Sequence, residues 1–301
     1  MVNKVFVFVP AFGQQVSATT FLTTHAVQAA LASKGIGGGI STLSFPDIAE
    51  LRSMATTIWY DTLLDSSHIL FVDADMGFAP DLVFDMLTFG EPVIGAIYPQ
   101  RKMPLSWAGS GTGENQAERR GNFMRVEGVG MGCTLIHRDA IRIMLDKFPE
   151  MVDTRLELHP AAGMLRDTGA KRLIRCFDKI DIPERGQVSE DLSFCMRWNK
   201  CGGTVWAAVG HRISHVGPFD YCGRYLDMVE AQQAQANAAA KAEAAAQKAA
   251  EAERVRLVHD QEALHTASEA AKAERDVAQT VVAVASAKRR SGRNGRHARA
   301  V

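Results

Sequence analysis

The sequence predicts an α/β fold, with a mostly parallel central sheet flanked by helices and a long helix after it. Strand-like and helix-like segments alternate over the first part of the chain, an order typical of parallel sheets. Residues 67–72 are almost wholly apolar, as expected for a strand buried on both faces. Residues 229–287 are rich in Ala and contain no Gly, Pro or aromatic residue, which predicts one long helix.

The elements follow in order from residue type. Residues 4–9 are largely β-branched or aromatic and end at Pro10, which predicts the first strand. We expect a helix from about residue 17 to residue 33, which Gly35 ends. The next predicted elements are a strand at 40–44, a helix at 47–64, a strand at 67–72, a helix at 80–89 and a strand at 92–98. After Gly128 the pattern is less regular.

Composition divides the chain into three parts. Residues 1–225 have Trp, Phe, Gly and Pro spread through them, as folded domains do. Residues 226–287 form the Ala-rich helix, which would reach on the order of 90 Å. Its large apolar residues are sparse, so it is expected to be a weak coiled coil that self-associates, or a solvated spacer. Residues 288–301 are basic, and we expect a disordered tail.

Charge and cysteine content bear on the class of protein. Lys+Arg and Asp+Glu are equal at 34 each, so net charge favours neither a nucleic-acid nor a membrane partner. The five cysteines are widely spaced, without a C-x-x-C pair, as in reduced intracellular proteins. The first apolar run is too short for a signal peptide, and none approaches the roughly 18 residues of a membrane span. We expect a soluble, cytoplasmic protein.

Two carboxylates follow the apolar strand at 67–72. Asp73 and Asp75 are two residues apart, so an extended chain would point them the same way. Ligands of open α/β sheets bind beyond the carboxyl ends of strands, and paired oxygen ligands there suit Mg²⁺ or Mn²⁺. The alternative is that both acids only cap a turn, or the helix expected near Pro80.

This motif resembles the DXD motif of the GT-A-fold glycosyltransferases. Three more segments resemble motifs of that family in the same order: a glycine-rich acceptor-side loop at 126–133, an xED motif at 189–194 and a C-terminal metal-binding histidine at 211–217. The resemblance covers about residues 1–225. It implies a GT-A-like, Rossmann-like fold and a metal-dependent transfer of sugar from a nucleotide-diphosphate sugar, with a UDP-sugar as the foremost donor.

Asp191 is the candidate catalytic base, with Glu190 as the alternate. Both acids stand where a helix is expected to begin, with Ser189 as a plausible N-cap. A carboxylate there could take the proton of an acceptor hydroxyl as it attacks the sugar. The xED resemblance implies inversion, although a retaining enzyme of the same fold could keep the same motifs. The alternative is that both acids only favour the helix N-terminus electrostatically.

The resemblance also implies a metal site that holds Mn²⁺ or Mg²⁺. Asp75 is expected to bind the metal directly, and His215 to join it, since a neutral imidazole is a good ligand for Mn²⁺. His211 is a weaker candidate. Asp73 is expected to contact the donor ribose or a metal-bound water. The alternative for His215 is a structural hydrogen bond.

The donor and acceptor sides follow from the same resemblance. The donor is placed against Pro10, Ala11, Phe12, Arg52, Asp73, Ala74 and Asp75. Arg52 could equally form a surface salt bridge. Arg101 and Lys102 could meet phosphate or acceptor, but for both the surface alternative is favoured. The acceptor side is placed at Gly130, Met131, Gly132 and Trp107. The glycines would let the backbone approach a sugar, or would form a plain bulge, and Trp206 is expected in the core.

The acceptor is not fixed by the sequence. A glycan and a hydroxylated base in modified viral DNA are both open, and the basic cluster at 288–299 could hold DNA through its phosphates or could be a solubilising end. A different class is a non-catalytic nucleotide-binding scaffold oligomerised by the long helix. A nuclease or phosphodiesterase usually needs more His and Asp ligands, and no such cluster is present in the sequence.

Overall fold

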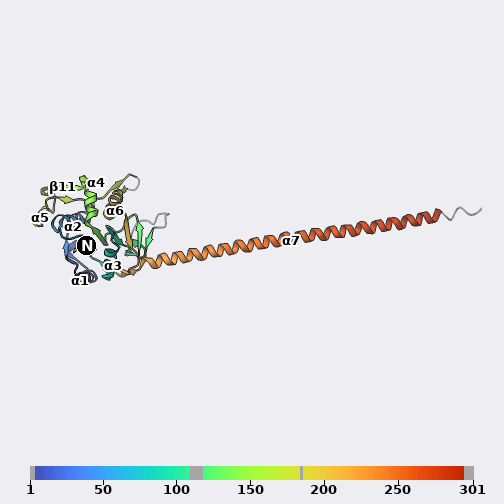
Figure 1. Cartoon of the computed structure of the whole chain (residues 1–301), viewed down its shortest axis with the longest axis horizontal. Coiled ribbons are helices and arrows are strands. Elements are labelled where there is room, and N and C mark those ends of the chain that lie inside the picture. The colour runs from blue at the N-terminus through green and yellow to red at the C-terminus, as the bar shows by residue number, and fades with distance from the viewer. Residues whose placement is uncertain (1–3, 109–117, 184–185, 295–301) are drawn as a thin grey trace, which may run out of the picture. The chain divides into compact units, whose positions relative to one another are not determined.

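The computed structural model describes residues 4–108, 118–183 and 186–294, with side chains given up to residue 287. The chain divides into two compact units, Met1–Glu230 and Ala231–Val301. The first unit is an α/β domain, and the described residues of the second, up to Asn294, belong to one long helix. The predicted class, a sheet flanked by helices with a long C-terminal helix, is confirmed (Figure 1).

The central sheet has eight strands in the order β2-β1-β3-β10-β5-β15-β9-β8. Neighbours pair in parallel from β2 through β1 to β3, and from β5 to β15, whereas β10 and β9 run antiparallel to both of their neighbours. All strands except β10 and β9 therefore run in the same direction, and the sheet is mostly parallel in this sense. Its strands are β1 (Lys4–Pro10), β2 (Gly37–Leu43), β3 (His68–Val72), β5 (Val93–Ala96), β8 (Arg119–Arg120), β9 (Phe123–Val126), β10 (Cys133–His137) and β15 (Val205–Ala208).

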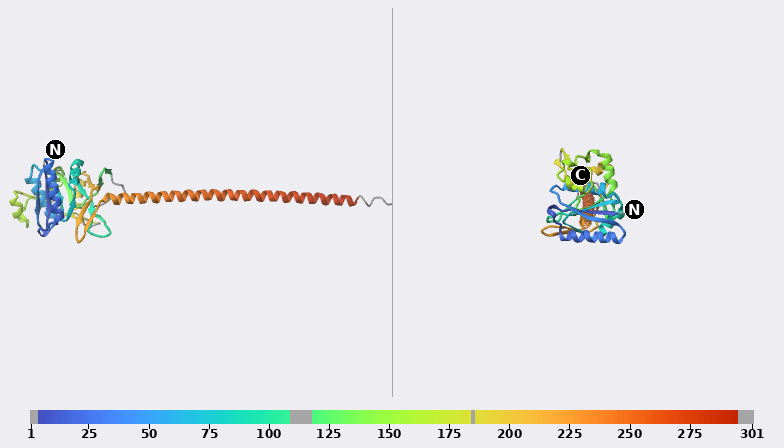
Figure 2. Two further views of the ribbon diagram at one scale, coloured as in Figure 1. Left: turned by 90° about the horizontal axis from the view of Figure 1, so that it is seen from below. Right: turned by 90° about the vertical axis from the view of Figure 1, so that its left-hand side faces the viewer.

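Helices cover both faces of the sheet. Alternate side chains of each strand point to opposite faces, so each face carries apolar side chains against which helices pack. Val5, Val7 and Val9 of β1 join one core with α1 and α3, while Phe6 and Phe8 join the other with α2, α4 and α6. Figures 1 and 2 show these two groups of helices on opposite sides. The helices are α1 (Ala18–Ser33), α2 (Ile48–Thr62), α3 (Asp81–Phe89), α4 (Arg138–Lys147), α5 (Ala162–Asp167) and α6 (Glu190–Lys200).

The elements predicted up to residue 98 are present, with two differences. Strand β2 begins at Gly37, three residues before the predicted start. Its Gly38 has a φ of +151°, and a Cβ there would lie 2.0 Å from the carbonyl oxygen of Val5, so only glycine lets β2 approach β1 so closely. The strand predicted at 92–98 ends at Ala96, and β6 (Tyr98–Pro99) turns away to pair with β7 (Trp107–Ala108).

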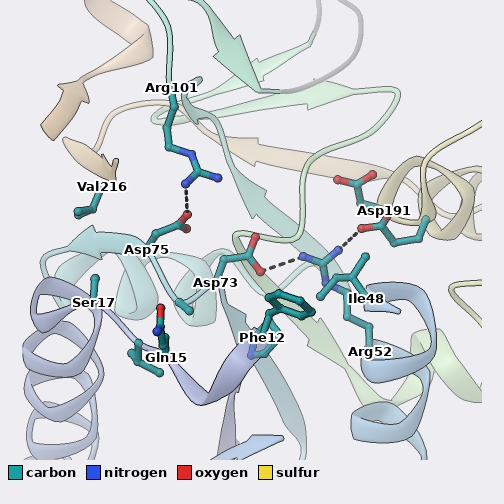
Figure 3. A pocket seen from close by; sticks show the side chains of 14 residues that line it. Phe12, Gln15, Ser17, Ile48, Arg52, Asp73, Asp75, Arg101, Asp191 and Val216 are labelled. Carbon is teal, nitrogen blue, oxygen red and sulfur yellow. Dashed lines mark hydrogen bonds and ion pairs between the residues drawn. The ribbon is translucent and has the colours of Figure 1, made fainter. Parts of the chain in front are cut away.

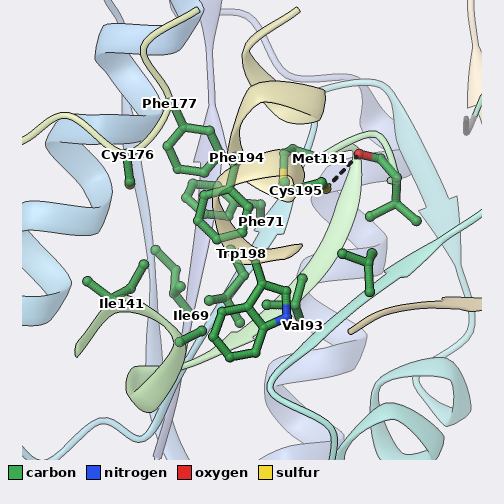
Figure 4. Close-up of a cluster of buried hydrophobic side chains, with 14 of the residues drawn as sticks. Ile69, Phe71, Val93, Met131, Ile141, Cys176, Phe177, Phe194, Cys195 and Trp198 are labelled. Atoms are coloured by element: carbon green, nitrogen blue, oxygen red, sulfur yellow. Dashed lines mark hydrogen bonds between the residues drawn. The ribbon is translucent and has the colours of Figure 1, made fainter. Parts of the chain in front are cut away.

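Stacked aromatic side chains fix helix α6 against the central strand β3. Phe71 meets Phe177 edge to face, with ring centroids 5.6 Å apart. Phe177 in turn stacks on Phe194 of α6, at 4.8 Å (Figure 4). Such aromatic pairs add stabilisation beyond the area that they bury. The N-terminus of α6 is therefore held near the end of β3.

A small three-stranded sheet lies beyond the end of β3. Strand β16 (Ile213–Val216) pairs antiparallel with both β4 (Met76–Phe78) and β17 (Asp220–Gly223). His215 stands opposite Met76, the residue that follows Asp75. Backbone pairing thus brings the C-terminal histidine beside the DXD segment. The remaining elements are β11 (Val152–Asp153), β12 (Leu173–Ile174), β13 (Asp181–Ile182), β14 (Gly186–Gln187) and 3-10 helices at Phe12–Gln14, Pro149–Met151 and Leu156–Leu158.

The C-terminal helix α7 runs from Tyr225 to Asn294. It continues past residue 287, where the Ala-rich segment was expected to end, so the first residues of the predicted tail are helical. Residues 295–301 lie outside the described part, as do the side chains of the basic cluster. In the part that the structure describes, no helix is both long and apolar enough to cross a membrane.

Candidate active site

A cavity of about 760 Å³ opens where β1 and β3 end (Figure 3). Its walls come from the segment after β1, the start of α1, helix α2, the turn after β3 and the first turn of α6. It is lined by Pro10, Phe12, Gln15, Val16, Ser17, Ile48, Arg52, Asp73, Ala74, Asp75, Arg101, Glu190, Asp191 and Val216. The structure therefore brings both predicted acidic motifs to one cavity.

Arg52 joins the two acidic motifs. Its Nη2 donates to Asp73 Oδ1 at 2.8 Å, and its Nη1 donates to Glu190 Oε1 at 2.5 Å. The Arg52 side chain is 4% exposed. Burial lowers the pKa of Arg52, but Asp73, Glu190 and Asp191 raise it more, and the net pKa is raised. The alternative of a surface salt bridge is therefore wrong: Arg52 is a buried cation between two acids.

Asp191 and Glu190 differ in how they are held. Glu190 is occupied by Arg52, whereas Asp191 Oδ1 accepts from the backbone N–H of Leu192 at 2.9 Å and from the hydroxyl of Ser189. Among the described residues, Asp191 Oδ2 has no hydrogen-bond donor. Ser189 occupies the N-cap position, but its side chain makes no capping bond. Among the described residues each acid has one oxygen without a donor, but Glu190 is paired with the Arg52 cation, whereas Asp191 makes no ion pair and so is the acid left to accept a proton.

Asp75 meets His215 and Arg101 on the other side of the cavity. Its Oδ2 lies 3.4 Å from His215 Nε2 and 3.0 Å from Arg101 Nη1. His215 Nδ1 lies 2.8 Å from the carbonyl oxygen of Pro99, so Nδ1 carries a proton and Nε2 faces Asp75. Burial lowers the pKa of His215, while the contacts with Asp75 and Pro99 raise it, and the net pKa is raised.

Asp73 and Asp75 do not point the same way, as an extended chain would have required. Strand β3 ends at Val72, and the N–H of Met76 donates to the carbonyl of Asp73 at 3.2 Å, which closes a turn. Asp73 then turns to Arg52, while Asp75 turns to His215 and Arg101. Figure 3 shows the contacts with Arg52 and Arg101 pointing in different directions. The expectation that both acids lie on one side is wrong, and Asp73 is not brought into a common ligand set with His215.

The predicted metal ligands Asp75 and His215 suit a cation whose remaining ligands come from water and substrate. Among the described residues, no group of three or more His, Cys, Asp or Glu side chains could hold a metal ion. Mg²⁺ is commonly bound by one or two carboxylates together with waters and substrate phosphates. A ligating histidine commonly donates its other ring N–H to a backbone carbonyl, as Nδ1 of His215 does to Pro99. The pair therefore fits a divalent cation that arrives with phosphate.

The glycine-rich loop encloses a tyrosine. A Cβ on Gly130 or Gly132 would lie 2.4 or 2.7 Å from the hydroxyl oxygen of Tyr98. The Tyr98 hydroxyl accepts from the backbone N–H of Gly132 at 3.3 Å. Met131 between them is 0% exposed and belongs to the core. The acceptor-side assignment of Met131 is therefore wrong, because it has no exposed surface to offer, and these glycines make room for a side chain of this chain.

The uncharged residues predicted to contact the donor lie at the cavity, with one exception. Pro10, Phe12 and Ala74 line it, and Phe12 is 74% exposed. Ala11 is 3% exposed and does not line the cavity, and its N–H donates to the carbonyl of Leu43 at 2.9 Å. Donor contact by the Ala11 side chain is therefore excluded by its burial.

Three other predicted residues lie elsewhere. Trp107 does not line the cavity and packs edge to face on Tyr225, at 5.4 Å, so it is not placed as an acceptor platform there. His211 Nε2 lies 2.9 Å from Asp85 Oδ2, so His215 is the one of the two candidate histidines that contacts Asp75. Trp206 is 1% exposed, which confirms its expected place in the core.

Five lining residues were not predicted: Gln15, Val16, Ser17, Ile48 and Val216. Ser17 caps α1, and its hydroxyl accepts from the N–H of Thr20 at 3.1 Å. The predicted helix start at residue 17 was the available signal, because helix N-termini bind phosphate. The others line the cavity only because of tertiary packing.

No protein-family model and no curated protein matches the chain. Among solved structures it is similar to "A197 from STIV", at 16% identity over 71% of this chain and 86% of that one, with a TM-score of 0.40. The catalytic domain of Drosophila β1,4-galactosyltransferase 7 in complex with xylobiose is similar at 14% identity, over 69% and 65%, with a TM-score of 0.35. A glycosyltransferase involved in the glycosylation of the major capsid of PBCV-1 is similar at 12% identity, over 53% and 72%, with a TM-score of 0.30.

Proposed function

We propose that the chain is a metal-dependent glycosyltransferase that moves a sugar from a nucleotide-diphosphate sugar to an acceptor hydroxyl. One observation carries the proposal: a single cavity is lined on one side by Asp75, whose Oδ2 lies 3.4 Å from His215 Nε2, and on another by Asp191, with a free Oδ2. Asp75 and His215 would support the departure of a diphosphate, and Asp191 would support the attack of a hydroxyl. These are the two chemical tasks of glycosyl transfer.

The charge of the cavity supports a bound cation. Of the described residues that line it, four are acids and two are arginines, which leaves two negative charges in excess. A diphosphate would be repelled there unless a divalent cation came with it. When bound, Mn²⁺ or Mg²⁺ would be held by Asp75 and His215 and would stabilise the negative charge of the leaving diphosphate.

Asp191 acts as the general base in this proposal. Its Oδ2 accepts the proton of the acceptor hydroxyl as that hydroxyl attacks the anomeric carbon. The hydrogen bonds from Ser189 and Leu192 hold Oδ1 and orient the carboxylate. Glu190 is a positioning residue, because it acts through Arg52. A direct attack of this kind inverts the anomeric configuration.

The nucleoside part of the donor is assigned to the β1 end of the cavity. Phe12 offers an exposed aromatic face there, and such faces stack on nucleobases. Asp73 keeps its Oδ2 for a ribose hydroxyl, since Oδ1 is occupied by Arg52. A UDP-sugar is the first donor to test.

The acceptor is assigned only as a hydroxyl compound, either a glycan or a hydroxylated base in DNA. For DNA, the basic cluster at 288–299 would add phosphate contacts, each of which makes binding more salt-dependent. Deleting residues 288–301 would then lower DNA affinity and flatten its dependence on salt. If affinity and salt slope were those of the full chain, the tail would have no part in DNA binding.

The test is donor hydrolysis by the full chain, followed by mass spectrometry over a panel of nucleotide sugars with Mn²⁺. Water replaces the unknown acceptor in this assay. We expect Asp191→Asn to lower turnover at least about 100-fold without weakening donor binding. Asp85→Asn, the same change at an acid paired with His211 outside the cavity, should leave turnover unchanged. Donor binding without turnover by the wild type would instead favour the non-catalytic scaffold.

A further inference from the structure

The two arginines that line the cavity are held in opposite ways. Arg52 is 4% exposed and contacts two acids. The Arg101 side chain is 49% exposed and, among the described residues, pairs with Asp75 alone. A buried cation between two acids is fixed, because its departure would leave buried charge uncompensated. A half-exposed ion pair contributes little and can exchange partners at little cost.

Arg101 contacts the same Asp75 oxygen that faces His215. Asp75 Oδ2 lies 3.0 Å from Arg101 Nη1 and 3.4 Å from His215 Nε2. A cation shared by Asp75 and His215 would therefore meet the guanidinium at the same oxygen. Two positive groups repel each other at such distances, so Arg101 and a divalent cation exclude each other at Asp75.

The geometry around Arg101 lets its guanidinium leave. A Cβ on Gly217 would lie 2.9 Å from Cδ and 3.5 Å from Cγ of Arg101. The absence of a side chain at Gly217 therefore leaves room for the methylene groups of Arg101. The backbone beneath is fixed, since the N–H of Val216 donates to the carbonyl of Asp75 at 2.7 Å. The Arg101 side chain thus lies over a fixed backbone and is 49% exposed. Figure 3 shows it reaching Asp75.

We propose that Arg101 is an exchangeable counter-cation. In the donor-free protein it neutralises Asp75. When a divalent cation binds to Asp75 and His215, Arg101 leaves and turns to the diphosphate of the donor, where a guanidinium is a strong partner for phosphate oxygens. The inference rests on the proposed function and extends it: Asp75 is never unpaired, and the diphosphate gains a second positive group.

The experiment measures Mn²⁺ binding to the full chain by the electron paramagnetic resonance signal of free Mn²⁺. Arg101→Gln removes the competing charge, and Lys102→Gln is the matched control that removes the neighbouring charge. We expect Arg101→Gln to bind Mn²⁺ about threefold to tenfold more tightly without nucleotide. UDP should bind the Mn²⁺-loaded variant about tenfold more weakly. Lys102→Gln should match the wild type in both measurements.

Three results would overturn the inference, and Asp75→Asn tells them apart. If the wild type binds Mn²⁺ and Asp75→Asn does not, but Arg101→Gln binds it no more tightly, the exchange is wrong and the proposed function stands. If UDP binds without Mn²⁺ and Arg101→Gln abolishes that binding, Arg101 replaces the metal permanently. If the wild type binds no Mn²⁺ with or without UDP, both proposals fail. Thermal unfolding of each variant shows that it is folded.

Discussion

Arg52 Nη2 lies 2.8 Å from Asp73 Oδ1, which ties helix α2 to the turn after β3 inside the cavity wall. The same guanidinium holds Glu190 at the start of α6. One buried cation therefore fixes both acidic motifs relative to each other, although they are far apart in the sequence. The fixed spacing between the donor side and the base side of the cavity depends on this contact.

Replacing Arg52 with Met should destabilise the protein by about 3–5 kcal/mol, because two acids would be left without their buried partner. Urea unfolding followed by circular dichroism measures this free energy. Arg172→Met is the matched control: Arg172 also makes a two-point contact, with Asp61, but its side chain is 32% exposed. It should cost no more than about 1 kcal/mol. Equal losses in the two variants would contradict the assigned role of Arg52.

The glycine at position 130 is predicted to be required because of Tyr98. Gly130→Ala would put a Cβ 2.4 Å from the tyrosine hydroxyl, and overpacking of this kind costs about 1–3 kcal/mol. Tyr98→Phe removes that oxygen, so the double variant should be more stable than the sum of the single changes. Gly163→Ala, in α5 with no atom within 4 Å of a Cβ, should not destabilise. Strict additivity of Gly130→Ala and Tyr98→Phe would exclude the clash.

Stability should fall in mild acid because of His68. Burial and the neighbouring His137 lower the pKa of His68 from 6.5 to about 4. The unfolded chain then binds the proton more readily, so stability is full above pH 6.5 and is lost as the pH falls toward 4. About 2 kcal/mol should be lost between pH 8 and pH 5. The urea midpoint at the two pH values measures the loss.

The His68→Gln variant separates this effect from other acid effects. It should lose less stability than the wild type between pH 8 and pH 5, because the titrating group is gone. His265→Gln on the exposed part of α7 should lose as much as the wild type. A pH dependence unchanged by His68→Gln would refute the assignment.

The first half of the fold was predictable because the order of apolar and polar residues in each segment matches the burial of that segment in the structure. Strand β3 is buried along its whole length, and its run of apolar residues shows this directly. The start of β2 was missed because Gly37, Gly38 and Gly39 carry no side chain, and the pairing with β1 decides their structure. The antiparallel insertion of β10 between β3 and β5 was not predictable, because no local pattern encodes a long-range pairing.

The site was predictable where residue type and chain position suffice. Asp75 and Asp191 were named from their residue type and their places after a strand and at a helix start, and His215 from the family resemblance; the structure brings the first two into one cavity and the third beside Asp75. The ion pair of Arg101 and the burial of Met131 were beyond reach. Each depends on how a loop packs against a distant segment, and neither leaves a periodic signal in the sequence.

The most direct test of the central claim is calorimetric titration of UDP into the full chain with Mn²⁺ and, separately, with EDTA. The account predicts binding with Mn²⁺ and at least about tenfold weaker binding with EDTA. Asp75→Asn should remove the difference, while Asp85→Asn should keep it. UDP that bound equally well in EDTA, or an Mn²⁺ effect that survived Asp75→Asn, would contradict a cation held at Asp75 as the basis of the reaction.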